Sequence, residues 1–211
     1  MKYYEETKKY DLAHLGRHIL ASDKLDGSNF RVEWNRKLSK KSRFTKGFKK
    51  FGTRHRVITK SNDPFFKMVE VFDEKYADIV DERFRTHKAF RNVDTITLYG
   101  EFVGQNSFAG WHVWEEPQDI FFFDVWLYKK GFLGPSEFYS EFRDISIPKL
   151  VYKGPLTEEF IKEVQENKYN LKEGVVYKFV DNKEIVRAKI KTQEWLDKIK
   201  EQFGVEKMLE Y

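Results

Sequence analysis

The chain has 211 residues, of which 40% are hydrophobic and 17% aromatic, a composition that supports a sizeable core. It contains no cysteine, which excludes disulfides and thiolate zinc sites. No apolar run reaches the length of a membrane span, and residues 1–10 do not resemble a signal peptide. We therefore expect a cytoplasmic, monomeric protein without a membrane partner.

The positive charge is concentrated in one segment. The formal net charge is +5, yet residues 36–60 contain eleven Lys or Arg and no acid, while the rest of the chain carries 28 basic against 34 acidic residues. Phe44, Phe48 and Phe51 are interleaved with the bases, a pattern that fits a polyanionic partner. A solvated loop that only aids solubility is the alternative. The bases expected to contact a nucleic-acid backbone are Lys40, Lys41, Arg43, Lys49 and Lys50.

The first two thirds of the chain mix strands and helices. In chain order the patterns predict a strand over 28–35, a strand around 56–59, a helix over 63–88, strands over 94–104 and 119–131, and a short helix over 135–143. The helix assignment over 63–88 follows from apolar residues at helical spacing, with Pro64 near its start.

The last third predicts a helix, a hairpin and a helix. Thr157 can cap a helix over 158–168, residues 173–192 read as a hairpin turning at 180–184, and a helix follows over 193–211. The predicted elements do not alternate as repeated βαβ units. We therefore expect an α+β fold of antiparallel sheets flanked by helices, with residues 1–211 forming a single domain.

Five short motifs follow one another along the chain. They are "KLDGSN" with Lys24, "YGEFVG" with Glu101, "FFFDVW" with Phe123, "EGVVYK" with Glu173, and "VRAKIK" with Lys189 and Lys191. This order resembles the covalent nucleotidyltransferase superfamily of ATP-dependent DNA ligases, RNA ligases and mRNA capping enzymes. Each motif is weak alone, but five in order make coincidence improbable. The resemblance implies the nucleotidyltransferase fold, an ATP-grasp-like ligase adenylation domain.

One position narrows the subfamily. DNA ligases and capping enzymes usually carry arginine five residues after the lysine, where this chain has Asn29. The pattern K-x-x-G-x-N, with Phe-Asp at Phe123, looks like the RNA ligase 2 family, which includes phage and RNA-editing ligases. A phage-encoded member would act in the host cytoplasm. The family also has an arginine after its first strand, for which Arg54 and Arg43 are candidates. Arg54 is preferred because it borders an extended segment.

The resemblance implies a role for each motif residue. Lys24 would attack the α-phosphate of ATP, release pyrophosphate and hold AMP covalently. Glu101 would bind the ribose hydroxyls, and Phe123 would stack on the adenine. Glu173 would bind Mg²⁺, or Mn²⁺ in its place, as a hard oxygen ligand. Asn29 would act mainly after adenylation, beside the phosphate that is sealed.

A nucleophilic lysine must first lose its proton. A free lysine has a pKa of about 10.4, which burial and nearby cations lower. Lys189 and Lys191, two residues apart on a predicted strand, point to one face with Arg187 and could supply that positive field. The same cations suit a triphosphate whose charge grows during attack. Asp23 and Asp26 would oppose the shift and are not assigned as activators.

We therefore expect an ATP-dependent RNA ligase that joins a 5′-phosphate end to a 3′-hydroxyl end of RNA. The alternatives are a minimal ATP-dependent DNA ligase acting on DNA, or a non-catalytic module that binds nucleotide or nucleic acid. Twenty residues follow Lys191, enough for one helix, so we expect no OB-type domain. The sequence leaves open whether the chain is naturally minimal or a piece of a longer protein.

Overall fold

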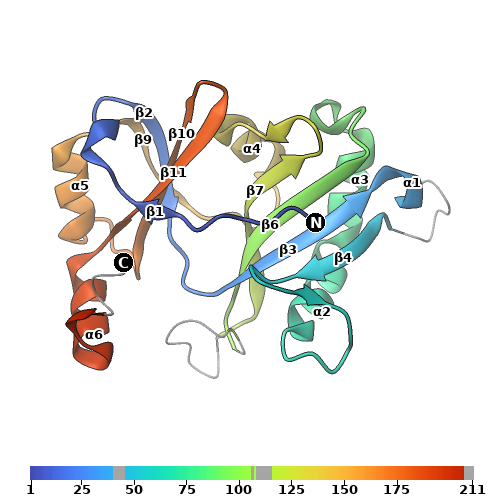
Figure 1. The fold of residues 1–211 in the computed structure, drawn as a ribbon, viewed down its shortest axis with the longest axis horizontal. Coiled ribbons are helices and arrows are strands. Elements are labelled where there is room, and N and C mark those ends of the chain that lie inside the picture. Colours follow the sequence, from blue (N-terminus) through green and yellow to red (C-terminus); the bar gives the residue numbers. More distant parts are fainter. Residues whose placement is uncertain (40–45, 106, 108–115, 207–211) are drawn as a thin grey trace. The chain divides into compact units, whose positions relative to one another are not determined.

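The computed structural model describes residues 1–39, 46–105, 107 and 116–206, and Figure 1 traces the chain through them. The chain divides into two compact units, each built from segments that are distant in sequence. The first unit comprises Met1–Tyr4 and Gly27–Ile147, and the second comprises Glu5–Asp26 and Pro148–Tyr211. Whether residues 1–211 act as one adenylyltransferase domain stays a prediction.

The first unit contains a six-stranded antiparallel sheet with the order β5-β4-β3-β6-β7-β8. Its strands are β3 (Ser28–Asn35), β4 (Phe48–Gly52), β5 (Val57–Ile58), β6 (Thr95–Val103), β7 (Asp119–Leu127) and β8 (Gly131–Phe132). Alternate residues of β3, namely Phe30, Val32 and Trp34, are fully buried in the core. The other face of the strand carries its polar side chains, as the predicted alternation requires.

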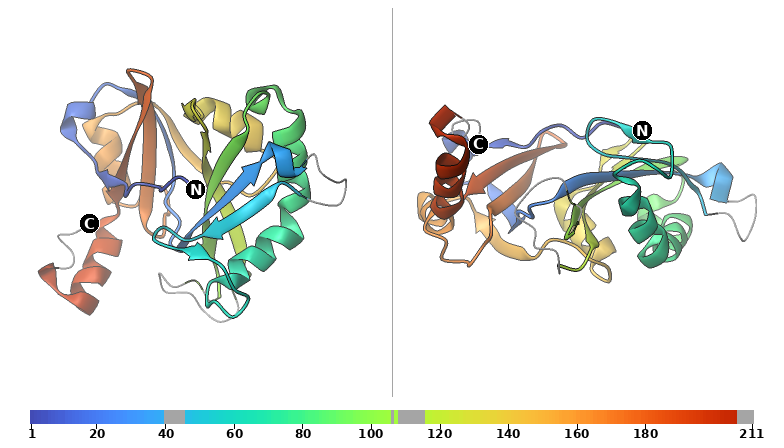
Figure 2. Two further views of the ribbon diagram at one scale, coloured as in Figure 1. Left: turned by 45° about the vertical axis from the view of Figure 1, so that its right-hand side comes forward. Right: turned by 90° about the horizontal axis from the view of Figure 1, so that it is seen from below.

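Helices cover the apolar face of this sheet. They are α2 (Phe66–Lys75), α3 (Ala77–Thr86), the 3₁₀ turn η2 (Lys88–Phe90) and α4 (Pro135–Phe142), while the short α1 (Arg36–Ser39) directly follows β3. Figure 2 shows α2 and α3 on one side of the strands. The sequence predicts a single helix over 63–88, but the structure has two helices that meet at Tyr76 (φ −125°). The Tyr76 hydroxyl lies 2.5 Å from Asp119 and 2.8 Å from Ser146, which fixes the break against the sheet.

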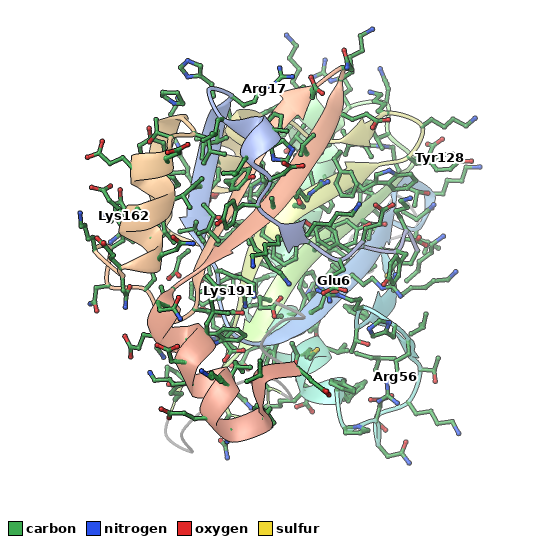
Figure 3. All side chains as sticks on the ribbon, turned by 60° about the vertical axis from the view of Figure 1, so that its left-hand side comes forward. Glu6, Arg17, Arg56, Tyr128, Lys162 and Lys191 are labelled. Carbon is green, nitrogen blue, oxygen red and sulfur yellow. The ribbon has the colours of Figure 1, made fainter. Side chains whose placement is uncertain are left out.

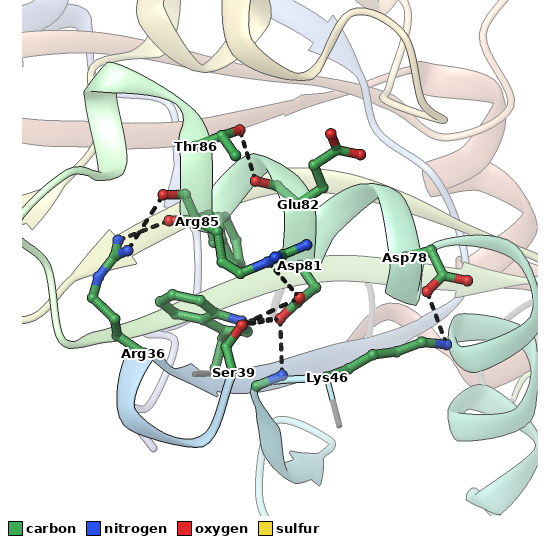
Figure 4. A network of polar contacts seen from close by, with 11 residues as sticks. Arg36, Ser39, Lys46, Asp78, Asp81, Glu82, Arg85 and Thr86 are labelled. Carbon is green, nitrogen blue, oxygen red and sulfur yellow. Dashed lines mark hydrogen bonds and ion pairs between the residues drawn. The ribbon is translucent and has the colours of Figure 1, made fainter. Parts of the chain in front are cut away.

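Asp81 joins α3 to the described ends of the basic segment (Figure 4). Its Oδ1 accepts hydrogen bonds from Trp34 Nε1 at 2.6 Å, Ser39 Oγ at 3.0 Å and Gly47 N at 2.8 Å. Arg85 Nε lies 2.9 Å from its other carboxylate oxygen. A buried carboxylate needs such partners, and here they hold the chain before and after residues 40–45.

The second unit contains a five-stranded sheet with the order β1-β11-β10-β2-β9. Its strands are β1 (Lys8–Lys9), β2 (His18–Asp23), β9 (Leu150–Pro155), β10 (Gly174–Asp181) and β11 (Glu184–Lys191), and its helical elements are η1 (Leu12–His14), α5 (Glu158–Gln165) and α6 (Gln193–Phe203). All pairings are antiparallel except the short parallel contact of β1 with β11. Helix α5 packs on the sheet through Phe160, Ile161 and Val164.

The predicted α+β fold of antiparallel sheets and flanking helices is confirmed. Thr157 caps α5 by accepting a hydrogen bond from Phe160 N at 3.0 Å. The predicted hairpin turns at Asn182 and Lys183, which both have positive φ (47° and 70°), as a type I′ turn requires. The sequence does not predict β1, β2, β4 or β9, which are short and whose pairing is set by distant strands. In the described ranges, no helix combines the length and apolarity needed to cross a membrane.

Candidate active site

Three motif residues of the second unit meet at one carboxylate. Lys24 Nζ lies 2.7 Å from Glu173 Oε2, and the Lys191 ammonium contacts Oε1 of the same group. Glu173 is 3% exposed and Lys191 5%, whereas the Lys24 side chain is 24% exposed. The most accessible of the three groups is therefore the proposed nucleophile, and a buried carboxylate orients it.

Backbone pairing brings these residues together. Lys24 follows the end of β2, and its N–H donates to the Gly174 carbonyl at 2.9 Å. Gly174 pairs with Lys191 across β10 and β11, and Thr192 N–H donates to the Glu173 carbonyl at 3.1 Å. Gly174 has a φ of 146°, and a Cβ there would collide with a carbonyl oxygen of β11. Only glycine permits this approach of the two strands.

The lysines affect each other's charge. Burial lowers the pKa of Lys191, and the positive charge of Lys24 acts in the same direction, against the attraction of Asp26. The Lys24 and Lys191 ammonium groups contact the same carboxylate of Glu173, and two like charges this close repel each other. An amine that is neutral near pH 7 is what a lysine nucleophile requires.

Asp23 directly precedes the nucleophile in the chain and is partly buried. Burial raises the pKa of Asp23, while the charges of Lys149, Lys172 and Lys24 act in the opposite direction. A carboxyl with a raised pKa opposes the deprotonation of Lys24 less than an ordinary aspartate would. This agrees with leaving Asp23 unassigned as an activator.

Strand β11 separates basic from apolar side chains as predicted. Ala188 and Ile190 are buried in the core with α5, so Arg187, Lys189 and Lys191 occupy the opposite face. Lys191 lies where β11 passes into α6 (Figure 3). The Lys189 ammonium lies 3.8 Å from Glu6, which is exposed.

Lys178 shares the basic face of the sheet, because it pairs with Arg187 in the register of β10 and β11. Counting from Glu173 by strict alternation predicts the opposite face for Lys178. That count fails because β10 begins at Gly174, so Glu173 stands outside the strand. The positive φ of Gly174 changes the backbone direction at this point.

Three motif residues of the first unit lie on the sheet face that the helices leave uncovered. Asn29 pairs with Glu101 in the register of β3 and β6. Phe123 sits at the irregularity between β6 and β7 and is half-buried, next to the fully buried Phe122. Asn29 Oδ1 is buried and has no hydrogen-bond partner among the described residues, which leaves it able to accept a bond from a bound group.

Tyr4 is a neighbour of Phe123 that the sequence motifs do not identify. Its ring centroid lies 5.1 Å from that of Phe123 at an interplanar angle of 65°, an edge-on contact. Its hydroxyl donates to Asp124 at 2.6 Å, and its ring lies 4.9 Å from Tyr99. Tyr4 stands outside every motif, and only the packing of Met1–Tyr4 on the sheet brings it there.

The basic segment is described in part. Lys40, Lys41 and Arg43 lie outside the described residues. Lys49 and Lys50 are exposed on β4, and Lys49 Nζ lies 3.1 Å from the buried Glu33. Arg54 lies in the turn from β4 to β5, and its Nε is buried without a hydrogen-bond partner in the part of the chain that the structure describes. Arg54 could therefore bond to a ligand.

A metal ion would find one carboxylate in the second-unit cluster. Nowhere in the described ranges do three His, Asp or Glu side chains gather as a metal site. Glu173 nevertheless offers a buried hard oxygen ligand, where a metal ion would take the place of one of the lysine ammonium groups. Mg²⁺ commonly binds through one or two carboxylates and takes its remaining ligands from water and substrate phosphates. Glu173 fits a metal of that kind.

Comparison with known proteins assigns the family. The sequence model of the family described as RNA ligase matches residues 17–191, a range that includes all five motifs. The chain belongs to the RNA ligase family, which confirms the resemblance seen in the sequence. No curated protein matches the chain in a sequence search.

Solved RNA ligases share the fold. A mutant of the Naegleria gruberi RNA ligase with ATP and Mn is similar with a TM-score of 0.68 and 18% identity, over 96% of this chain and 59% of that one. The same ligase with pyrophosphate gives 0.68 and 17%, again over 96% and 59%. An archaeal ATP-dependent RNA ligase gives 0.66 and 18%, over 94% and 50%. This chain thus spans between half and three fifths of the length of these proteins.

Proposed function

We propose that this chain is an ATP-dependent RNA ligase that joins a 5′-phosphate end to a 3′-hydroxyl end. The observation that carries the proposal is the contact of Lys24 and Lys191 with the single carboxylate of Glu173. Glu173 orients the Lys24 side chain, and the neighbouring Lys191 ammonium opposes the positive charge of Lys24 and so favours the loss of its proton. Membership of the RNA ligase family supports RNA as the substrate.

In the first step, Lys24 Nζ attacks the α-phosphate of ATP. A P–N bond forms, the bond from the α-phosphorus to the bridging oxygen breaks, and pyrophosphate leaves. Lys24 gives up its proton in this step, which the second ammonium of the cluster favours. Lys189 and Lys191 are placed to offset the charge of the phosphates, because both lie on the basic face of β11.

In the second step, an oxygen of the RNA 5′-phosphate attacks the AMP phosphorus, and the P–N bond to Lys24 breaks. In the third step, the RNA 3′-hydroxyl attacks the 5′-phosphorus and loses its proton. A phosphodiester forms and AMP leaves. Asn29 has its proposed role here, since its unpartnered buried oxygen can accept a hydrogen bond.

The other motif residues are proposed to bind the nucleotide. Phe123 stacks on the adenine, Glu101 accepts from the ribose hydroxyls, and Arg54 contacts the nucleotide. Glu173 would hold Mg²⁺ or Mn²⁺, which supplies positive charge at the phosphates when bound.

Two alternative functions, a DNA ligase and a non-catalytic binding module, can be distinguished from an RNA ligase by experiment. A DNA ligase would seal DNA nicks at least as well as RNA nicks, and family membership speaks against this. A non-catalytic binding module would need neither a reactive lysine nor its charged neighbours.

The deciding experiment incubates the purified protein with ATP and Mg²⁺ and records its intact mass. A mass increase of one AMP supports the proposal, and RNA, DNA and mixed nicks then define the substrate. An unchanged mass with bound ATP would indicate a binding module.

Replacing Phe123 with alanine is expected to weaken ATP binding by about 1–3 kcal/mol, the range for a base stacked on an aromatic ring. Phe121→Ala is the matched control, because Phe121 is a half-buried phenylalanine on the same strand. Titration calorimetry with ATP measures both variants. Unchanged affinity in Phe123→Ala would assign Phe123 to the core and the adenine platform to another ring.

Reversing the charge of Lys40, Lys41, Lys49 and Lys50 to glutamate is expected to impair RNA joining more than lysyl adenylation. Every lysine that no longer binds a phosphate flattens the dependence of RNA affinity on salt concentration, by about one unit of log–log slope. The control reverses Lys129 and Lys130, which are exposed near a turn of the same unit. RNA affinity is measured at several salt concentrations. A slope equal to that of the wild type would mean that these four lysines only face solvent.

A further inference from the structure

Lys191 contacts an aromatic ring as well as a carboxylate. Its Nζ lies 3.5 Å from the centroid of the Trp195 ring, and the same ammonium contacts Glu173. Trp195 is 6% exposed and belongs to α6, which starts directly after the strand that carries Lys191. The ammonium is thus held from two directions, by an anion and by the face of an indole.

The position of the ring is set by the backbone around Glu173. Thr192 is fully buried, and its N–H donates to the Glu173 carbonyl at 3.1 Å. The Thr192 hydroxyl then caps α6 by accepting a hydrogen bond from Trp195 N at 3.2 Å. One short path of hydrogen bonds therefore connects the carboxylate residue, the helix cap and the ring. The first turn of α6 is fixed relative to the cluster.

A lysine side chain has four rotatable bonds, and holding it in one rotamer costs conformational entropy. An ion pair restrains the ammonium by charge, without a fixed direction. The face of an indole attracts a cation through its quadrupole and is the strongest of the aromatic partners. Together the two contacts restrict Lys191 to the neighbourhood of Glu173 and Lys24.

We propose that Trp195 is a positioning residue, which holds the Lys191 ammonium at Glu173 during attack of Lys24 on ATP. The inference rests on the proposed function and extends it to α6, which lies after the last motif. Trp195 acts through Lys191 and need not touch the nucleotide. Removing the ring should therefore slow the chemical step more than it weakens ATP binding.

The test compares three variants by single-turnover formation of lysyl-AMP over a range of ATP concentrations. Trp195→Leu keeps an apolar side chain but no π face, and it is expected to lower the maximal rate by about 5- to 30-fold, consistent with a desolvated cation–π contact. The ATP concentration at half-maximal rate should change by less than about 2-fold. Trp195→Phe retains a ring face and should recover most of the rate. Ile199→Ala, a buried residue one turn further along α6, controls for helix packing.

Equal losses of rate in Trp195→Leu and Ile199→Ala would overturn the proposal, because packing alone would explain both. So would a loss in Trp195→Phe as large as that in Trp195→Leu. A double-mutant cycle adds a measurement that a change in packing alone would not affect, namely whether the two substitutions reduce the rate independently. In a Lys191→Met background, Trp195→Leu should produce no further loss of the remaining rate, and a full independent loss would contradict the proposal.

The wild type, Trp195→Leu, Lys191→Met and the double variant are then unfolded in urea. The destabilisation caused by Trp195→Leu and Lys191→Met is expected to be non-additive, because the two side chains share one contact. Strict additivity would overturn the proposal. If the wild-type protein formed no lysyl-AMP, the proposed function would be refuted, and the positioning role with it. This would hold even if the unfolding free energies of the Trp195→Leu and Lys191→Met variants were non-additive. If the wild-type protein formed lysyl-AMP but the effects of Trp195→Leu and Lys191→Met were additive, only the positioning role of Trp195 would be refuted.

Discussion

Replacing Lys24 with alanine is expected to reduce lysyl-AMP formation by more than about 1,000-fold, because Lys24 supplies the nitrogen of the P–N bond. The fold should persist. Lys24 follows the end of β2 with a partly exposed side chain, and Glu173 keeps Lys191 as a partner. Intact mass after incubation with ATP and Mg²⁺ measures the loss, and thermal unfolding verifies the fold.

Lys24→Arg is the informative companion. It keeps a positive charge against Glu173 but is not a nucleophile at neutral pH, since a guanidinium keeps its proton there. It should be as inactive as the alanine variant. Lys162→Ala, which removes an exposed lysine of α5 in the same unit, should adenylate normally. AMP attachment to Lys24→Ala at the wild-type level would refute the assignment of the nucleophile.

Lys24→Ala is also expected to join RNA that already carries AMP on its 5′ end. The third step uses the RNA 3′-hydroxyl as nucleophile and forms no bond to lysine. Retained joining would separate loss of the nucleophile from general damage to the site.

Substituting glutamine for Glu173 is expected to lower the rate of lysyl-AMP formation by about 100-fold or more, similar to the loss of a preorganised electrostatic group. The amide preserves the volume but cannot offset two ammonium groups. Removing one partner of a buried ion pair also destabilises a protein by about 3 kcal/mol. Both the rate and the free energy of unfolding should therefore fall.

The matched control is Glu184→Gln, which neutralises an exposed glutamate at the start of β11. It should leave both quantities close to those of the wild type. Titrating ATP separates binding from chemistry in Glu173→Gln. Normal adenylation in a folded Glu173→Gln protein would show that the carboxylate is only a structural partner of Lys191.

The sequence by itself determined the features that depend on local chemistry. The residues "VDNKE" specify a hairpin because Asn182 and Lys183 can adopt positive φ at the turn. Thr157 specifies the start of α5 because its side chain bonds to the helix N-terminus. Alternation along β11 separates the basic residues from Ala188 and Ile190. The motif order indicated the RNA ligase family, which the family comparison confirmed.

The tertiary structure decided which residues meet. Lys24 and Glu173 are far apart in the chain, and they form an ion pair because β2 pairs with β10. No local pattern predicts that pairing, since hydrogen bonds between strands are available to any extended segment. For the same reason the sequence does not predict β4, in which Phe48 and Phe51 pack against the core and the two lysines between them are exposed.

Two aromatic residues show most clearly what the sequence motifs do not identify. Tyr4 and Trp195 belong to no motif, and aromatic side chains most often fill cores. Tyr4 reaches the distant Phe123 through the packing of the first unit, whereas Trp195 contacts Lys191, four residues earlier, where β11 passes into α6. Residue type and spacing therefore identified the groups that can do chemistry. Only long-range packing determined that Lys24 and Lys191 share the carboxylate of Glu173.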